Sequence, residues 1–236
     1  MKYLSVLLPS IILAACGGGG GSAPAPAPVA STSTFQLKQA YTNDFNNTLP
    51  YSYTISGTIT GANIAGNGST TQSVVSNTTF ESVAALQKSR TSSGSVVANG
   101  PGGTVTIPLA PSTETLYVSP TYNLLGYTAS GAYTVAAVPV TIPLTALVGS
   151  SGTIGAFNTF TSSAKLGVPA TNVISWALEA DTATTALMKL TQTIRTSAGV
   201  LSATQVDTFR ITPAGGVTRI SQTATIVGTG TLTLTY

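Results

Sequence analysis

The amino-acid sequence predicts an all-β domain, built as an antiparallel meander that forms a barrel, a half-barrel or a sandwich. Three observations indicate this class. Threonine, valine and isoleucine are abundant, and only 6% of the residues are charged. Apolar and polar residues alternate with a period of two over several stretches. Short sequences rich in glycine, proline and serine separate these stretches, as in strands that are connected by tight turns.

The first clear strand begins at Tyr51. Here Tyr51, Tyr53 and Ile55 alternate with serine and threonine, which predicts a half-buried strand. The preceding residues 35–45 carry mixed signals and stay unassigned. Residues 79–89 fit both a helix and a strand. We favour the strand, because no glycine C-cap and no sustained apolar face follow.

The middle of the chain predicts further short strands. Val96-Val97 and Val105-Thr106-Ile107 flank a turn rich in glycine and proline, which indicates a hairpin. The pentapeptide VTIPL occurs at residues 105–109 and again at residues 140–144. Because proline cannot donate a hydrogen bond to a sheet, both copies should end strands or lie on edges.

The last third of the chain predicts the strands most clearly. Five segments alternate or carry many β-branched residues, and short turns separate them. These segments are residues 172–180, 187–196, 200–211, 217–226 and 231–236.

The N-terminal end differs from the rest of the chain. Lys2 and the apolar run after it are typical of a secretory signal, and the run is too short to span a bilayer as a helix. Leu13, Ala14, Ala15 and Cys16 then form an aliphatic residue, two small residues and a cysteine. This tetrapeptide resembles the lipobox of bacterial lipoproteins. The resemblance implies that Cys16 carries diacylglycerol, becomes the first residue after cleavage and is acylated on its amino group.

A tether follows the cysteine. Residues 17–21 are glycines and residues 23–28 repeat Ala-Pro, so the segment should hold the domain about 25 Å from the lipid surface. We therefore divide the chain into a signal peptide (1–15), a lipidated cysteine with its tether (16–34) and one β domain (35–236). In enteric-type sorting, an aspartate after the cysteine marks inner-membrane retention. Gly17 occupies that place, so the resemblance to proteobacterial lipoproteins implies the outer membrane, with either leaflet possible.

Missing residue types restrict the chemistry of the domain. The chain has no histidine, and its single cysteine is Cys16. The domain therefore lacks a disulfide, a Ser-His-Asp triad and the main ligand of zinc sites. We expect a non-enzymatic protein without a cofactor or metal site. Nine cations and six anions spread along the chain also argue against nucleic-acid binding.

Two patterns of polar residues deserve comparison with known catalytic sites. Glu179 and Asp181 lie two apart and would share one face of a strand, but an aspartate that starts a turn beside a solvated glutamate is the simpler interpretation. Ser162 and Lys165 match the Ser-x-x-Lys pattern of penicillin-binding proteins and β-lactamases. The flanking residues predict strand and loop rather than the required helix, and the companion motifs are missing.

A ligand pocket is the remaining candidate site. Ile174, Trp176 and Leu178 share one strand face, and Tyr51 and Tyr53 share another, so these residues can line an apolar pocket. They fit an ordinary hydrophobic core equally well, and the core is the simpler interpretation.

Three functional hypotheses follow from the sequence. The leading one is a lipid-anchored envelope protein whose β domain is structural or binds an envelope lipid, glycan or protein. The alternative is a surface-displayed, adhesin-like module that binds a glycan or a protein. The third is a membrane-inserted β-barrel or a cryptic hydrolase. Residues 232–236, which alternate and end in tyrosine, resemble the C-terminal signal of outer-membrane barrels.

Overall fold

The computed structural model describes residues 30–236. The predictions on the signal peptide, on Leu13, Ala14, Ala15 and Cys16 of the lipobox and on Gly17 lie outside the described residues. The described part contains one helix, α1 (Leu37–Asn46). The strands are β1 (Tyr51–Ile59), β2 (Ala62–Gln72), β3 (Ser76–Phe80), β4 (Val83–Gly100), β5 (Gly103–Val118), β6 (Leu124–Ala129), β7 (Ala132–Ala136), β8 (Ser151–Phe160), β9 (Ala170–Ala180), β10 (Ala186–Arg195), β11 (Leu201–Ile211), β12 (Val217–Ile226) and β13 (Gly230–Thr235).

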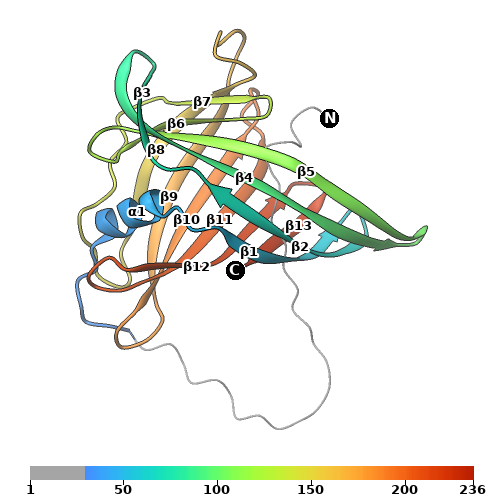
Figure 1. Ribbon diagram of the computed structural model, residues 1–236, viewed down its shortest axis with the longest axis horizontal. Helices are drawn as coiled ribbons and strands as arrows, with labels where there is room; N and C mark the ends of the chain where they lie inside the picture. The colour runs from blue at the N-terminus through green and yellow to red at the C-terminus, as the bar shows by residue number, and fades with distance from the viewer. Residues whose placement is uncertain (1–29) are drawn as a thin grey trace.

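The thirteen strands form one antiparallel sheet that closes on itself (Figure 1). The order is β2-β1-β13-β12-β11-β10-β9-β8-β7-β6-β5-β4-β3. An additional pairing between β2 and β4 closes a barrel of twelve strands. β3 pairs with the beginning of β4, outside the segment that β2 covers. The all-β prediction is confirmed, and of the three predicted architectures the barrel is the observed one.

The predicted strands of the last third are confirmed. β9 to β13 occupy the five predicted segments, with ends that differ by one or two residues. The ambiguous residues 79–89 belong to β3 and β4 except for a two-residue turn, so the strand that we favoured is observed. Glu81 and Ser82 form the turn between β3 and β4 with positive φ angles of 51° and 64°.

The two VTIPL copies have different structures. Pro108 lies inside β5 opposite Ser95 of β4. β6 pairs only with residues 115–118 of β5, so Pro108 lies on an edge, as we expected. Pro143 lies outside the strands, in the connection between β7 and β8. The shared pentapeptide therefore does not mark a structural repeat.

The unassigned residues 35–45 contain most of α1. The helix has no side-chain N-cap hydrogen bond and no acidic residue in its first turn, so the sequence lacks the usual signals of a helix start. Burial of Leu37, Ala40 and Phe45 against the barrel stabilises it instead. Within residues 30–236, no helix is long and apolar enough to cross a membrane.

The interior contains two apolar clusters. The first packs α1 against several strands and includes Phe45, Phe157, Leu178 and Met188. The second lies among β1, β2, β4 and β13 and includes Ile55. Because a barrel of twelve strands is wider than side chains alone can fill, α1 takes up part of the lumen.

The outward face of the barrel carries rows of hydroxyl groups. β12 and β13 place Thr225 beside Thr231 and Thr223 beside Thr233, with hydroxyl oxygens 3.1 and 2.7 Å apart. Side chains alternate between the two faces of a strand, so the intervening Leu232 points inward and is buried. The abundant threonines therefore form the outer side of this wall.

Candidate functional site

A cavity of about 230 Å³ lies inside the barrel, between α1 and the strands. It extends from α1 to Ala129 and Ile194, near the far ends of β6 and β10. The volume is somewhat below the ~300–1,000 Å³ of common small-molecule sites. The polar residues of the wall are Tyr41, Asp44, Tyr51, Thr70, Arg90, Ser92, Ser112, Glu114, Tyr127, Gln192, Gln205, Asp207, Arg219, Gln222 and Tyr236.

Asp44 of α1 binds two arginines of the wall. Its Oδ2 accepts hydrogen bonds from Arg90 on β4 at 2.9 Å and from Arg219 on β12 at 2.5 Å. Between 12 and 15% of each of these side chains is exposed. Burial alone would raise the pKa of Asp44, but the guanidinium groups of Arg219 and Arg90 outweigh burial and lower it. The ionised carboxylate therefore connects α1 to two strands.

Aromatic rings surround the second of these arginines. The Arg219 guanidinium carbon lies 5.2, 5.1 and 6.0 Å from the ring centroids of Tyr51, Phe209 and Tyr236. These distances fit cation–π contacts. The rings and Asp44 together hold the guanidinium in one place at the cavity wall.

Two further carboxyl groups of the wall lack such a partner. Burial raises the pKa of Glu114 and of Asp207. Glu114 lies opposite Arg90 in the register of β4 and β5, but Arg90 forms its ion pair with Asp44 instead. Gln205 Nε2 donates to Asp207 Oδ2 at 3.0 Å. Both carboxyl groups therefore hold a proton at a higher pH than exposed carboxyl groups do.

Two buried polar atoms of wall residues have no hydrogen-bond partner. They are the Tyr41 hydroxyl oxygen and Arg90 Nε. Burial raises the pKa of Tyr41, so its hydroxyl remains protonated and can donate. Because buried polar groups in proteins are nearly always hydrogen-bonded, such atoms beside a cavity point to a bound molecule or to ordered water.

The far part of the wall is fixed by amide groups. The Tyr127 hydroxyl accepts hydrogen bonds from Asn172 Nδ2 at 3.0 Å and from Gln192 Nε2 at 2.9 Å. Burial raises the pKa of Tyr127, so this hydroxyl keeps its proton and can itself donate. The Asn172 Oδ1 is buried without a partner. This side of the cavity therefore offers fixed hydrogen-bonding groups beside apolar side chains such as Ala129 and Ile194.

Two lysines hold the ends of α1. The fully buried Lys88 donates to the carbonyl oxygen of Asn47, the residue after the helix. Burial, helped by the charge of Arg90, lowers the pKa of Lys88 to about 8. Lys38 donates to the Tyr122 carbonyl oxygen at 2.9 Å. These bonds fix the helix and thereby the position of Asp44.

The predicted pocket residues fall into three places. Ile174 and Tyr51 line the cavity. Trp176, 8% exposed, and Leu178, 1% exposed, belong to the apolar cluster around α1. Tyr53 belongs to the second cluster. The structure therefore brings Ile174 and Tyr51 to one cavity, whose wall combines apolar side chains with many polar and charged ones.

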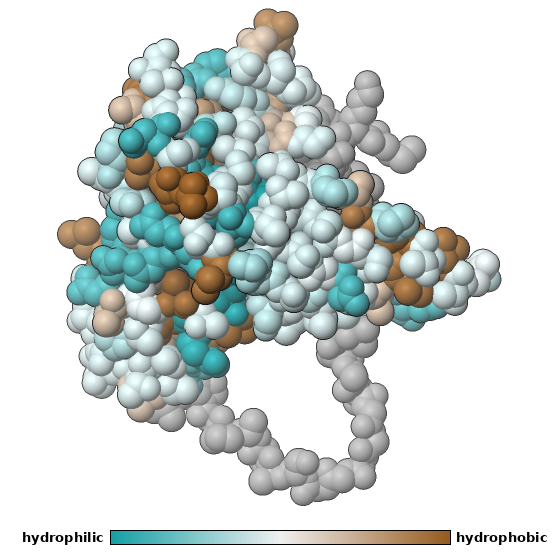
Figure 2. Space-filling model, in the orientation of Figure 1, coloured by the Kyte–Doolittle hydropathy of each residue, from teal (hydrophilic) through white to brown (hydrophobic). Residues whose placement is uncertain are grey.

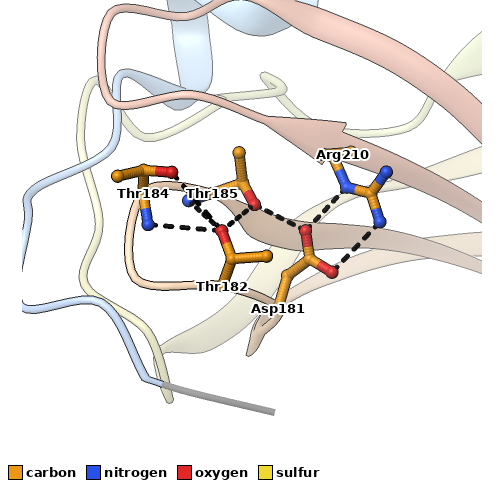
Figure 3. A network of polar contacts seen from close by, with 5 residues as sticks. All are labelled: Asp181, Thr182, Thr184, Thr185 and Arg210. Atoms are coloured by element: carbon orange, nitrogen blue, oxygen red, sulfur yellow. Dashed lines mark hydrogen bonds and ion pairs between the residues drawn. The ribbon is translucent and has the colours of Figure 1, made fainter. Parts of the chain in front are cut away.

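Asp181 belongs to a turn between β9 and β10 (Figure 3). Its carboxylate accepts hydrogen bonds from Arg210 Nε at 2.6 Å and Nη2 at 3.2 Å, and from Thr185 Oγ1 at 2.6 Å. Thr182 Oγ1 accepts the backbone N–H groups of Thr184 and Thr185 at 3.2 and 3.0 Å. The network stabilises the turn, in agreement with the simpler interpretation of this aspartate.

The other candidate residues from the sequence, Glu179, Ser162 and Lys165, also form contacts that stabilise the structure. Glu179 forms a separate ion pair with Lys189 at 2.6 Å, so it shares no site with the aspartate two residues later. Lys165 lies after β8, where its backbone N–H donates to the Ser162 carbonyl oxygen at 3.1 Å, and its ammonium group pairs with Glu81. The Ser-x-x-Lys pattern therefore lies in a turn rather than on a helix.

The sequence analysis did not single out the residues at the centre of the cavity. Glu114, Asp207 and Arg219 occupy inward positions of strands, each two residues from an apolar inward neighbour such as Leu116 or Phe209. A charged residue at an inward position is the sequence signal that identifies them. To apply this signal, one must know which residues of each strand point inward. That depends on the register of the strand, which the sequence defines only approximately.

Comparison with protein-family models, curated proteins and solved structures finds no match for this chain. Within the described part of the chain, no group of three or more His, Cys, Asp or Glu side chains could hold a metal ion. The structure therefore describes the chain by its geometry: an all-β barrel with a helix in its lumen and, beside that helix, a cavity with both apolar and charged groups in its wall.

Between acidic and neutral pH, we expect the barrel to be most stable at about pH 4 to 5. The pKa of Asp44 is lowered by folding, so its stabilising effect is present above the ordinary aspartate pKa and is lost as the pH falls through the folded value. The pKa values of Glu114 and Asp207 are raised, so their effect is present below the ordinary carboxyl pKa and is lost as the pH rises through the folded values.

Urea unfolding at several pH values measures this profile. The double variant Glu114→Gln/Asp207→Asn should flatten the loss of stability between acidic and neutral pH, and the acid limb should remain. A double variant that loses stability towards neutral pH as steeply as the original protein would contradict the assignment.

Proposed function

We propose that this chain is a non-enzymatic, lipid-anchored protein of a bacterial cell envelope, attached to the outer membrane through Cys16, whose barrel binds a small polar molecule in its lumen. The cavity beside α1 is the main support for the binding function. Its wall combines charged groups, amides and tyrosines, and includes the unpartnered Tyr41 hydroxyl and Arg90 Nε. This composition favours a ligand with several oxygen atoms, such as a small glycan fragment or a hydroxy acid.

The chemistry of the wall argues for binding over the other hypotheses. An acyl chain would leave the buried Tyr41 hydroxyl and Arg90 Nε without hydrogen-bond partners, so a lipid tail is a poor occupant. The outward hydroxyl groups, such as those of the exposed Thr225 and its neighbour Thr231, favour contact with water over contact with lipid tails. No histidine or thiol is available in the domain to act as a nucleophile or a general base.

The binding proposal is tested by filling the cavity. Ser112 lines the cavity, and Thr113 is exposed on the opposite face of the same strand. We expect the full chain, purified from its envelope, to carry a small polar molecule that native mass spectrometry detects. The variant Ser112→Phe should lose that molecule, and the matched control Thr113→Phe should keep it. A wild-type chain without a bound molecule, or a Ser112→Phe variant that retains it, would contradict lumen binding.

The anchoring proposal is tested separately. Labelled palmitate should enter the full chain, and Cys16→Ala should abolish both the label and the membrane fractionation. A Cys16→Ala chain that still fractionates with membranes would exclude this anchor and leave the lumen proposal standing.

A further inference from the structure

The hairpin of β4 and β5 projects beyond the rest of the barrel (Figure 1). β5 pairs with β4 over its length, but β6 pairs only with residues 115–118 of β5. Within residues 30–236, residues 104–111 of β5 therefore have a strand on one side and none on the other. This free edge interrupts the strand pairing in the projecting part of the sheet; β3, at the end of the strand order, is a second strand with a neighbour on one side only.

The turn determines which backbone groups face the free edge. Gly100 and Gly103 pair across a two-residue turn, and the closing pair of such a hairpin exchanges both hydrogen bonds. In an antiparallel ladder, hydrogen-bonded and non-hydrogen-bonded pairs alternate along the strand. The N–H and C=O groups of Thr104 and Thr106 therefore point away from β4, towards the free edge. Pro108 has the same orientation but no N–H.

The side chains of this edge carry no charge and are partly apolar. Val105 is 58% exposed and Ile107 is 44% exposed. Figure 2 shows apolar surface on the projecting hairpin. Residues 91–113 contain no charged residue. Native edge strands are usually protected by charges, by proline or by a covering segment, and here only proline contributes.

We propose that this edge pairs with the same edge of a second copy of this chain, antiparallel, about a two-fold axis through Val105. In this register Thr104 of one copy lies opposite Thr106 of the other, so every free N–H of these threonines meets a carbonyl oxygen. Val105 lies opposite itself, and Ile107 lies opposite Gly103, which leaves room for the larger side chain. Two identical edges without charged residues can pair without electrostatic repulsion. The edge also carries no charged group that would select a partner of opposite charge.

The proposal is independent of the lumen function, and proline substitution tests it. Thr106→Pro removes an outward N–H without removing a bond to β4, and Pro108 shows that this strand tolerates proline in the same orientation. Sedimentation of the full chain in mild detergent should give a dimer for the original protein and a monomer for Thr106→Pro, with unchanged thermal unfolding of the barrel. A monomeric original protein, or a Thr106→Pro variant that remains dimeric, would overturn the proposal.

A cysteine cross-link tests the register. With Cys16→Ser in every variant, the introduced thiol is the only one in the chain. Residues opposite each other in a non-hydrogen-bonded pair have Cα atoms ~4.5 Å apart, which a disulfide can bridge. Val105→Cys should therefore form at least roughly fivefold more disulfide-linked dimer than Leu166→Cys, whose position is exposed elsewhere on the barrel. Equal cross-linking of the two variants would contradict the two-fold axis.

Discussion

Replacing Asp44 by asparagine should lower the free energy of unfolding by about 3 to 5 kcal/mol. The carboxylate accepts hydrogen bonds from Arg90 and Arg219, and all three side chains are mostly buried. Asparagine has nearly the same size, so the variant removes the charge and leaves two guanidinium groups without their counterion. Urea unfolding at neutral pH measures the loss.

The matched control is the surface ion pair of Glu179 with Lys189, whose side chains are 48% and 34% exposed. Glu179→Gln should cost at most about 1 kcal/mol, because water and salt screen an exposed pair. A loss of similar size in both variants would show that burial does not strengthen the contact of α1 with the wall.

Glu114 can compensate in part for the loss of Asp44. It lies opposite Arg90 across β4 and β5, and its pKa is raised while the arginine is engaged elsewhere. Removal of Asp44 frees Arg90 to pair with Glu114, which should lower the pKa of this glutamate. The double variant Asp44→Asn/Glu114→Gln should therefore lose more stability than the sum of the two single variants.

This coupling leads to a prediction on access to the cavity. Residues 35–46 follow the segment that the sequence predicts to be a tether, and the helix lines one side of the cavity through Tyr41, Asp44 and Phe45. If the arginines have alternative partners on the wall, α1 can separate from the barrel without leaving both buried charges unpaired. Limited proteolysis within residues 37–46 should therefore be faster in the Asp44→Asn variant than in the original protein.

Much of the fold could be predicted because the signals were local. Alternation along β9 to β13 and the glycine-rich turns between them define both the strands and their antiparallel order. The closure of the ring was not predictable. β2 and β3 both pair with β4, and the sequence does not show which segment of β4 each of them takes. α1 was missed because its stability comes from the burial of Leu37 and Phe45 in the barrel instead of from its own capping signals.

The candidate site was less predictable than the fold. A search for apolar and aromatic residues found Tyr51 and Ile174 of the cavity wall. It did not find Asp44 or its two arginines, which are separated by 46 and 175 positions in the sequence. Their meeting depends on strand register and on the insertion of a helix, and neither leaves a local pattern.

The seam between β2 and β4 that closes the barrel depends on glycine. A Cβ atom added to Gly94 of β4 would lie 2.3 Å from the Asn67 carbonyl oxygen and 2.8 Å from the Gly68 Cα on β2. A Cβ atom on Gly66 would lie 2.2 Å from the Ser95 carbonyl oxygen. These neighbours are backbone atoms, so relief requires the two strands to separate.

Gly94→Ala should therefore destabilise the barrel by about 2 to 3 kcal/mol or more. The matched control is Gly102→Ala in the turn of the same hairpin, where an added Cβ meets nothing within 4 Å. This control should change stability by no more than about 0.5 kcal/mol. Urea unfolding gives both values, and hydrogen exchange should show faster exchange along β2 and β4 in Gly94→Ala only. Equal stability of the two alanine variants would mean that the seam accommodates a side chain and that closure of the lumen does not depend on this close approach.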